Sequence, residues 1–249
     1  MKGSRMVGMV LWLWSACVWA DPVRISTGEW PPLIDSSAPG DGPLARVVRE
    51  AFAQQGIEVE FVFLPWRRAL WEVESGAVPL SMAWRHTPAR DARFLFSSEN
   101  VYQGENLFFY NRLSRFDWKS PDDLARYRLG GVRGYAYSDA FDEAARSGKL
   151  NVFRVNDEKS LIAMLLAGRI DAFPADRQVG RNLIYQYAGD KADQIGVHPL
   201  PLTRKPLYLV GSRTDAAQQL MSRFDEGLRQ LKASGKFREI YMPREMAEK

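Results

Sequence analysis

The chain has few of the side chains on which metal sites and many enzymes depend. Its 249 residues include one cysteine, Cys17, and two histidines, His86 and His198. Neither histidine has a cysteine, histidine or acidic neighbour at the spacing of a metal-binding motif. Phosphate-binding loops, dinucleotide-binding glycine motifs and serine-nucleophile motifs are also absent. The sequence therefore indicates neither a metal nor a cofactor.

Charge of one sign is not in large excess either. The chain has 34 lysines and arginines against 30 acidic residues, for a formal charge of +4. Without Lys2 and Arg5 the basic count falls to 32 and the charge to +2. The basic residues are scattered rather than gathered in a stripe, so no nucleic-acid partner is expected.

Long apolar runs are missing after residue 20, where nothing approaches the roughly 20 residues of a membrane-spanning helix. The first twenty residues combine a basic start at Lys2 and Arg5, an apolar run over 6–18 and a cleavage site ending at Ala20. This pattern predicts a cleaved secretory signal, and hence a periplasmic protein that has lost Cys17. Two alternatives are a buried N-terminal helix and lipid attachment at Cys17.

After residue 20 the sequence alternates short β-rich runs with helical patterns, which is typical of an α/β fold. Strands are expected near 23–27, 57–63, 79–83, 128–132, 152–155, 170–173 and 207–210. Helices are expected near 43–55, 66–74, 120–124, 138–146, 160–167, 177–186 and 217–231. No flexible Gly/Ser linker divides the chain, so two lobes would be joined by extended segments at 106–110 and 203–210.

Three segments place polar or aromatic residues where a predicted strand ends, the position at which open α/β sheets bind ligands. In 27–32, prolines hold Trp30, which would either face a ligand or plug the core. In 82–98, Arg90 would grip a carboxylate or form a surface salt bridge. In 168–176, Asp171 is expected inside a strand. Asp176 lies at that strand's end, where it would pair with a ligand ammonium or cap the next helix.

Together these segments resemble the family 3 extracellular solute-binding proteins, which serve mainly the uptake of polar amino acids. The matching phrases follow the family's order, at 27–33, 87–97, 129–134, 168–172 and 231–237. The resemblance implies the type II periplasmic-binding-protein fold, with two α/β lobes and two crossing hinge strands. Lobe 1 would comprise residues 21–109 and 204–249, lobe 2 would comprise 110–203, and the ligand would bind between them.

The resemblance also suggests roles for single residues. Arg90 matches the arginine that grips an α-carboxylate, Asp176 the acid that receives an α-ammonium, and Trp30 the aromatic that covers the ligand. The chain departs from the family at Arg85, where threonine or serine is usual, and at Tyr135, where a small hydroxyl residue is usual. Residues 64–69 also look like those of a divergent branch.

The full expected ligand-binding set contains three of the five tryptophans after residue 20 and three arginines. It comprises Glu29, Trp30, Trp66, Arg67, Trp84, Arg85, Arg90, Gly134, Tyr135 and Asp176. Aromatic walls with excess positive charge suit a ligand that carries a carboxylate. We therefore expect a monomer that captures a small polar ligand for an inner-membrane ABC-type permease or a sensor receptor, and catalyses no reaction.

Two other functions remain open. The resemblance extends to cyclohexadienyl dehydratases built on the same fold, whose chemistry requires a general acid in the cleft. Glu29 or Asp176 would supply that acid. The second alternative is an interaction module that binds no small ligand, which a cleft rich in tryptophan makes less attractive.

Overall fold

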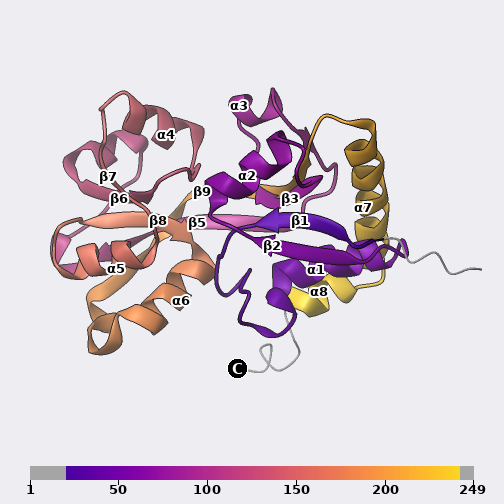
Figure 1. The fold of residues 1–249 in the computed structure, drawn as a ribbon. Helices are drawn as coiled ribbons and strands as arrows, with labels where there is room; N and C mark the ends of the chain where they lie inside the picture. The colour runs from indigo at the N-terminus through magenta and orange to yellow at the C-terminus, as the bar shows by residue number, and fades with distance from the viewer. Residues whose placement is uncertain (1–20, 242–249) are drawn as a thin grey trace, which may run out of the picture.

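The computed structural model describes residues 21–241. The expected secretory signal and the alternatives for Cys17 lie outside these residues. Within them, no helix has the length and apolar character needed to cross a membrane. The described chain forms two α/β lobes on either side of a pair of long strands (Figure 1).

Lobe 1 is built on a parallel sheet in which β1 (Val23–Thr27) lies between β2 (Val59–Phe63) and β3 (Leu80–Trp84). The two-residue strand β4 (Leu95–Phe96) adds to the same sheet by pairing with β9. The helices of this lobe are α1 (Pro43–Ala53), α2 (Trp66–Glu74), α3 (Pro88–Asp91), α7 (Asp215–Ala233) and α8 (Lys236–Tyr241).

Helices α1 and α7 pack closely because their contact includes a glycine. The apolar residues of α1 recur at helical spacing and are fully buried, and the Phe52 ring lies 5.3 Å from the Phe224 ring of α7. A Cβ added at Gly227 would lie 1.9 Å from the carbonyl oxygen of Ala51. Glycine is therefore required there for the two helices to pack.

Lobe 2 repeats the arrangement of lobe 1. Strand β6 (Arg128–Val132) pairs in parallel with β7 (Asn151–Val155) and β8 (Ala172–Asp176). Its helices are α4 (Asp139–Arg146), α5 (Lys159–Leu166) and α6 (Arg177–Tyr187). Short 3₁₀ turns complete the chain at Pro39–Asp41, Arg112–Ser114, Pro121–Arg126 and Gly189–Gln194.

Two long antiparallel strands, β5 (Tyr102–Asn111) and β9 (Ile195–Gly211), connect the lobes. Strand β9 pairs with β3 of lobe 1 near its C-terminal end, whereas β5 pairs with β8 of lobe 2. The resulting strand order is β2-β1-β3-β9-β5-β8-β6-β7. This architecture confirms the expected fold class with its two crossing strands. The expected lobe boundaries at 109 and 204 fall inside β5 and β9 and stay predictions.

Most expected elements occur within a residue or two of their predicted bounds, but several differ. Strand β8 begins at Ala172, so Asp171 precedes the strand, and its carboxylate accepts a 2.7 Å bond from Arg128. Strand β9 is far longer than 207–210 because β5 pairs with its proline-containing first half, with shifts of register. Helices α3 and α8 and the two-residue strand β4 were not expected at all, and β5 extends beyond the expected segment 106–110.

Candidate ligand-binding site

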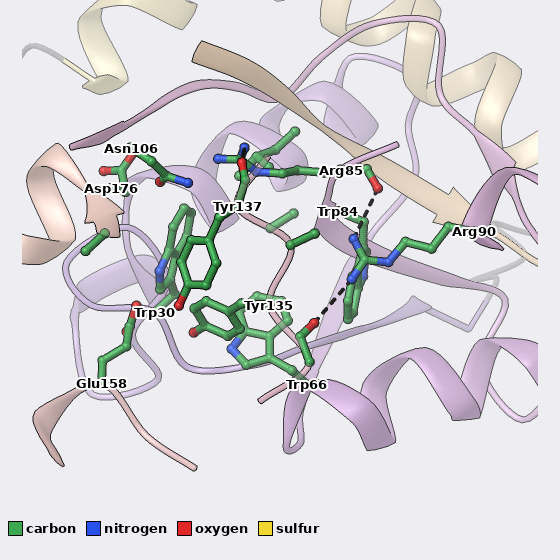
Figure 2. A pocket seen from close by; sticks show the side chains of 15 residues that line it. Trp30, Trp66, Trp84, Arg85, Arg90, Asn106, Tyr135, Tyr137, Glu158 and Asp176 are labelled. Atoms are coloured by element: carbon green, nitrogen blue, oxygen red, sulfur yellow. Dashed lines mark hydrogen bonds between the residues drawn. The ribbon is translucent and has the colours of Figure 1, made fainter. Parts of the chain in front are cut away.

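A hollow between the lobes contains about 590 Å³ of space, including the open solvent at its mouth. Both lobes and both connecting strands contribute to its wall (Figure 2). Its lining residues are Trp30, Trp66, Ala83, Trp84, Arg85, Arg90, Asn106, Gly134, Tyr135, Ala136, Tyr137, Glu158, Ala175, Asp176 and Leu207. We call this space the inner hollow.

Three tryptophans form the lobe 1 wall of the inner hollow. Trp30 sits in a turn closed by backbone hydrogen bonds to Ile34, and its ring meets Tyr102 edge to face. Trp66 opens α2 and donates its indole N–H to the carbonyl oxygen of Glu29. The Trp66 and Trp84 rings meet edge to face at 5.3 Å. Such contacts hold large flat surfaces at fixed angles.

Two backbone positions, Gly28 and Ala83, support the tryptophan wall. A Cβ at Gly28 would lie 2.4 Å from the Trp66 ring, so glycine is needed for the ring to pack there. Ala83 has a φ of 70°, in the left-handed region that non-glycine residues rarely adopt. The irregularity in β3 between Ser81 and Trp84 includes this residue. Such strained positions concentrate at functional sites.

Two arginines of lobe 1 reach across to lobe 2. The Arg85 side chain is buried and donates to the carbonyl oxygen of Tyr137 at 3.0 Å. Arg90 donates to the carbonyl oxygens of Arg85 and Gly134, and its Cζ lies 4.8 Å from the Trp84 ring centre. Within residues 21–241, neither guanidinium forms an ion pair with a carboxylate.

Burial makes both guanidinium groups unusually acidic. It lowers the pKa of Arg90 to about 10, and the positive charge of Arg85 acts in the same direction. Burial also lowers the pKa of Arg85, although the negative charges of Asp176 and Asp142 oppose the shift. With a pKa of about 10, Arg90 remains cationic at neutral pH, and a ligand carboxylate would relieve the repulsion between the two guanidinium groups.

Asp176 lies at the end of β8 and also caps α6. Its buried carboxylate accepts bonds from the backbone N–H groups of Gln178 at 2.9 Å and Glu105 at 3.3 Å, and from the Tyr102 hydroxyl at 3.2 Å. Burial raises its pKa, and these hydrogen bonds oppose the rise. The carboxylate therefore caps the helix while also lining the inner hollow. Its pairing with a ligand ammonium stays a prediction.

Eight of the ten expected binding residues line the inner hollow: Trp30, Trp66, Trp84, Arg85, Arg90, Gly134, Tyr135 and Asp176. Glu29 and Arg67 do not; they line a neighbouring space, which we call the outer hollow. The Glu29 carboxylate accepts bonds from the backbone and hydroxyl of Ser36. Arg67 follows Trp66 on α2, and successive helical residues point about 100° apart. Arg67 is thus exposed while Trp66 lines the cavity.

Sequence reasoning missed several residues of the wall. The polar ones are Asn106 on β5, Tyr137 and Glu158. Tyr137 follows Gly134 and Tyr135 closely, so the same loop could have indicated it. Glu158 sits in a charged stretch, Asn156 to Lys159, that resembles any solvated turn. Within the described residues, no group of three or more His, Cys, Asp or Glu could hold a metal ion.

Comparison with known proteins agrees with this architecture. The sequence profile of the bacterial extracellular solute-binding proteins, family 3, matches residues 26–243. A search of curated protein sequences found no match. An ancestral arginine-binding protein bound to arginine superposes with a TM-score of 0.73 at 18% identity, covering 88% of this chain and 96% of that chain.

Two other solved structures superpose as well. A histidine kinase sensor domain with similarity to periplasmic binding proteins gives a TM-score of 0.73 at 19% identity, covering 89% of this chain and 94% of that one. The GluR0 ligand-binding core from Nostoc punctiforme, in complex with L-glutamate, gives 0.72 at 19% identity, covering 88% and 97%. At such identities the likeness shows the fold alone. The profile match covers most of the chain, which therefore belongs to the family 3 bacterial extracellular solute-binding proteins.

Proposed function

We propose that this protein works in the periplasm, where it captures a small, polar, carboxylate-bearing ligand in the inner hollow and catalyses no reaction. The observation that carries the proposal is the pair of arginines in the inner hollow, the buried Arg85 and the half-buried Arg90, which lack carboxylate partners within the described chain. A ligand carboxylate is the complementary group for a planar guanidinium. Arg90 is the main anchor and Arg85 the second.

Asp176 supplies the opposite charge on lobe 2. Its negative charge acts on Arg85 of lobe 1, and both side chains line the inner hollow. A ligand with a carboxylate and an ammonium, such as an amino acid, can therefore satisfy both lobes at once. Binding would favour the closed arrangement, in which Arg85 and Arg90 also bond to lobe 2 carbonyls.

Intrinsic tryptophan fluorescence tests this proposal directly because Trp30, Trp66 and Trp84 all line the inner hollow. We expect a saturable change on titration with at least one class among amino acids, dicarboxylates and oligopeptides. If no compound of the panel changes the fluorescence, that result would contradict ligand capture and favour an interaction module. If a ligand binds, we expect the closed protein to be recognised by a permease or a sensor receptor. Genes for a permease and an ATPase beside this gene would support transport.

A dehydratase is the second candidate, favoured by a single observation. Of the two acids first considered, Glu29 lies outside the inner hollow and Asp176 is held as a helix cap. Glu158, however, lines the inner hollow, and burial raises its pKa to about 8, as suits a general acid. Incubation with arogenate or prephenate would yield an aromatic product if the protein were such an enzyme.

A further inference from the structure

Glu158 lies at the boundary between two neighbouring spaces. It precedes α5 at its N-terminal end and lines both the inner and the outer hollow. Among the described residues, only Trp66 and Tyr135 also line both hollows, and their rings meet edge to face at 6.4 Å. A ligand anchored in the inner hollow would therefore direct its far end past these rings toward Glu158. Glu158 lies on the side of the cavity away from Arg90 (Figure 2).

The carboxyl group of Glu158 has no cationic partner within residues 21–241. Burial raises its pKa to about 8, and the negative charges of Asp176 and Asp157 add to this shift. The charges acting on it thus come from β8 and from its own loop, while the hydroxyls of Tyr135 and Tyr137 lie on the loop after β6. Arg67, Arg133 and Lys159 line the outer hollow without pairing with it.

The groups around Glu158 are suited to a cation. The Trp30 indole lies beside the carboxyl and lowers its pKa, yet its buried N–H has no hydrogen-bond partner among the described residues. Trp30, Trp66 and Tyr135 line the inner hollow together with Glu158. Aromatic faces attract cations and repel anions, most strongly where water is excluded.

We propose that Glu158 is a specificity-determining residue that selects ligands carrying a cationic group, an ammonium or a guanidinium, at the end remote from their carboxylate. This inference rests on the proposed function and narrows its ligand class. When the cation binds, Glu158 loses its proton to the solvent and the two charges pair between the aromatic rings. Ligand affinity therefore rises with pH until the carboxyl is already ionised in the free protein.

Matched ligand pairs test the proposal. Calorimetric titration compares L-arginine with L-citrulline and L-lysine with L-norleucine, because each pair differs in the charge of the far group. We expect the wild type to prefer the cationic member of a pair by at least about tenfold. In the Glu158→Gln variant the preference should fall to about twofold or less, since a neutral amide cannot pair with the cation. Glu143→Gln, an exposed change on α4, is the control and should keep the preference.

Proton release gives a second measurement that needs no variant. Titrations at about pH 6.5 in buffers of different ionisation enthalpy should show nearly one proton released per cationic ligand, and none with the neutral partner. Equal affinity within both pairs, a preference that survives Glu158→Gln, or the absence of proton release would each overturn the inference. If only neutral amino acids or dicarboxylates bind, this inference fails while ligand capture stands. If nothing binds, both fail.

Discussion

The guanidinium of Arg90 lies over the Trp84 indole, with its Cζ 4.8 Å from the ring centre. Backbone carbonyls of Arg85 and Gly134 accept two of its N–H groups and complete the hold on this side chain. A long side chain that is held in this way loses little further freedom when a carboxylate binds. Arg90 is therefore pre-organised for a carboxylate in this arrangement of the lobes.

Replacing Arg90 should remove the main carboxylate anchor. Arg90→Ala should weaken binding by about tenfold or more, because losing one partner of a buried charged pair costs about 2–5 kcal/mol. Arg90→Lys should recover only part of the loss, since an ammonium lacks the planar fork. Fluorescence or calorimetric titration measures both. Arg93→Ala, which removes a neighbouring exposed ion pair with Glu74, is the control. Unchanged affinity in Arg90→Ala would refute the anchor.

Asp176 allows its two roles to be separated by one pair of substitutions. Asp176→Asn keeps a side-chain oxygen that can cap α6 but removes the negative charge, so it should preserve most of the stability and reduce affinity for amine-bearing ligands by about tenfold or more. Asp176→Ala should also cost roughly 1 kcal/mol of unfolding free energy through the lost cap. Thermal melts and titrations distinguish the effects. Full binding by Asp176→Asn would show that the carboxylate serves only as the cap.

The unliganded protein should show a stability signature of Glu158. Its folded-state pKa of about 8 exceeds the ordinary glutamate value. At low pH the carboxyl is protonated in both the folded and unfolded chains and has no net effect. Above the ordinary value only the unfolded chain ionises, so the wild type loses unfolding free energy, by at most about 1.4 kcal/mol per pH unit, until about pH 8.

The Glu158→Gln variant lacks this titration, so its stability relative to wild type should rise between acidic pH and about pH 8. Denaturant unfolding at several pH values measures the difference. Glu143→Gln should run parallel to the wild type because this side chain is exposed. A constant difference between wild type and Glu158→Gln across the range would show that the carboxyl is not buried as the structure describes.

Gly227 tests the packing of lobe 1 independently of the site. A side chain at this position would collide with the Ala51 carbonyl of α1. Gly227→Ala should therefore lower the unfolding free energy by about 1–3 kcal/mol, despite the better helix propensity of alanine. Gln219→Ala, at an exposed position of the same helix, should change it by less than about 0.5 kcal/mol. A stabilised Gly227→Ala variant would contradict the close helix contact.

The hydrophobic period and the flanking residues predicted the helices and strands well, because both depend on residues that are neighbours in the chain. Helix α2 and strand β6 have the predicted bounds, since period and flanking residues determine where such elements begin and end. The first half of β9 could not be predicted in this way. Its prolines are typical of a loop, and it is extended because β5, distant in sequence, provides the pairing edge.

Some residues of the candidate site could likewise be predicted from the sequence, and others could not. Trp30, Arg90 and Asp176 follow strand ends, where the chain order alone indicates a ligand-facing position. Glu158 carries no such signal, and Glu29, which follows a strand end, carries a misleading one. In the sequence a carboxylate in a turn looks alike whether it faces solvent or a cavity. The difference depends on how the second lobe lies against the first.

By itself, the sequence of this protein determined the alternation of helices and strands, the family and most of the residues at the lobe boundary. These follow from side-chain periodicity and from short motifs, which are properties of neighbouring residues. Only the tertiary structure decided which loops meet, which carboxylates are buried and which arginines lack partners. Burial and charge depend on groups that are distant in sequence, and folding alone brings them together.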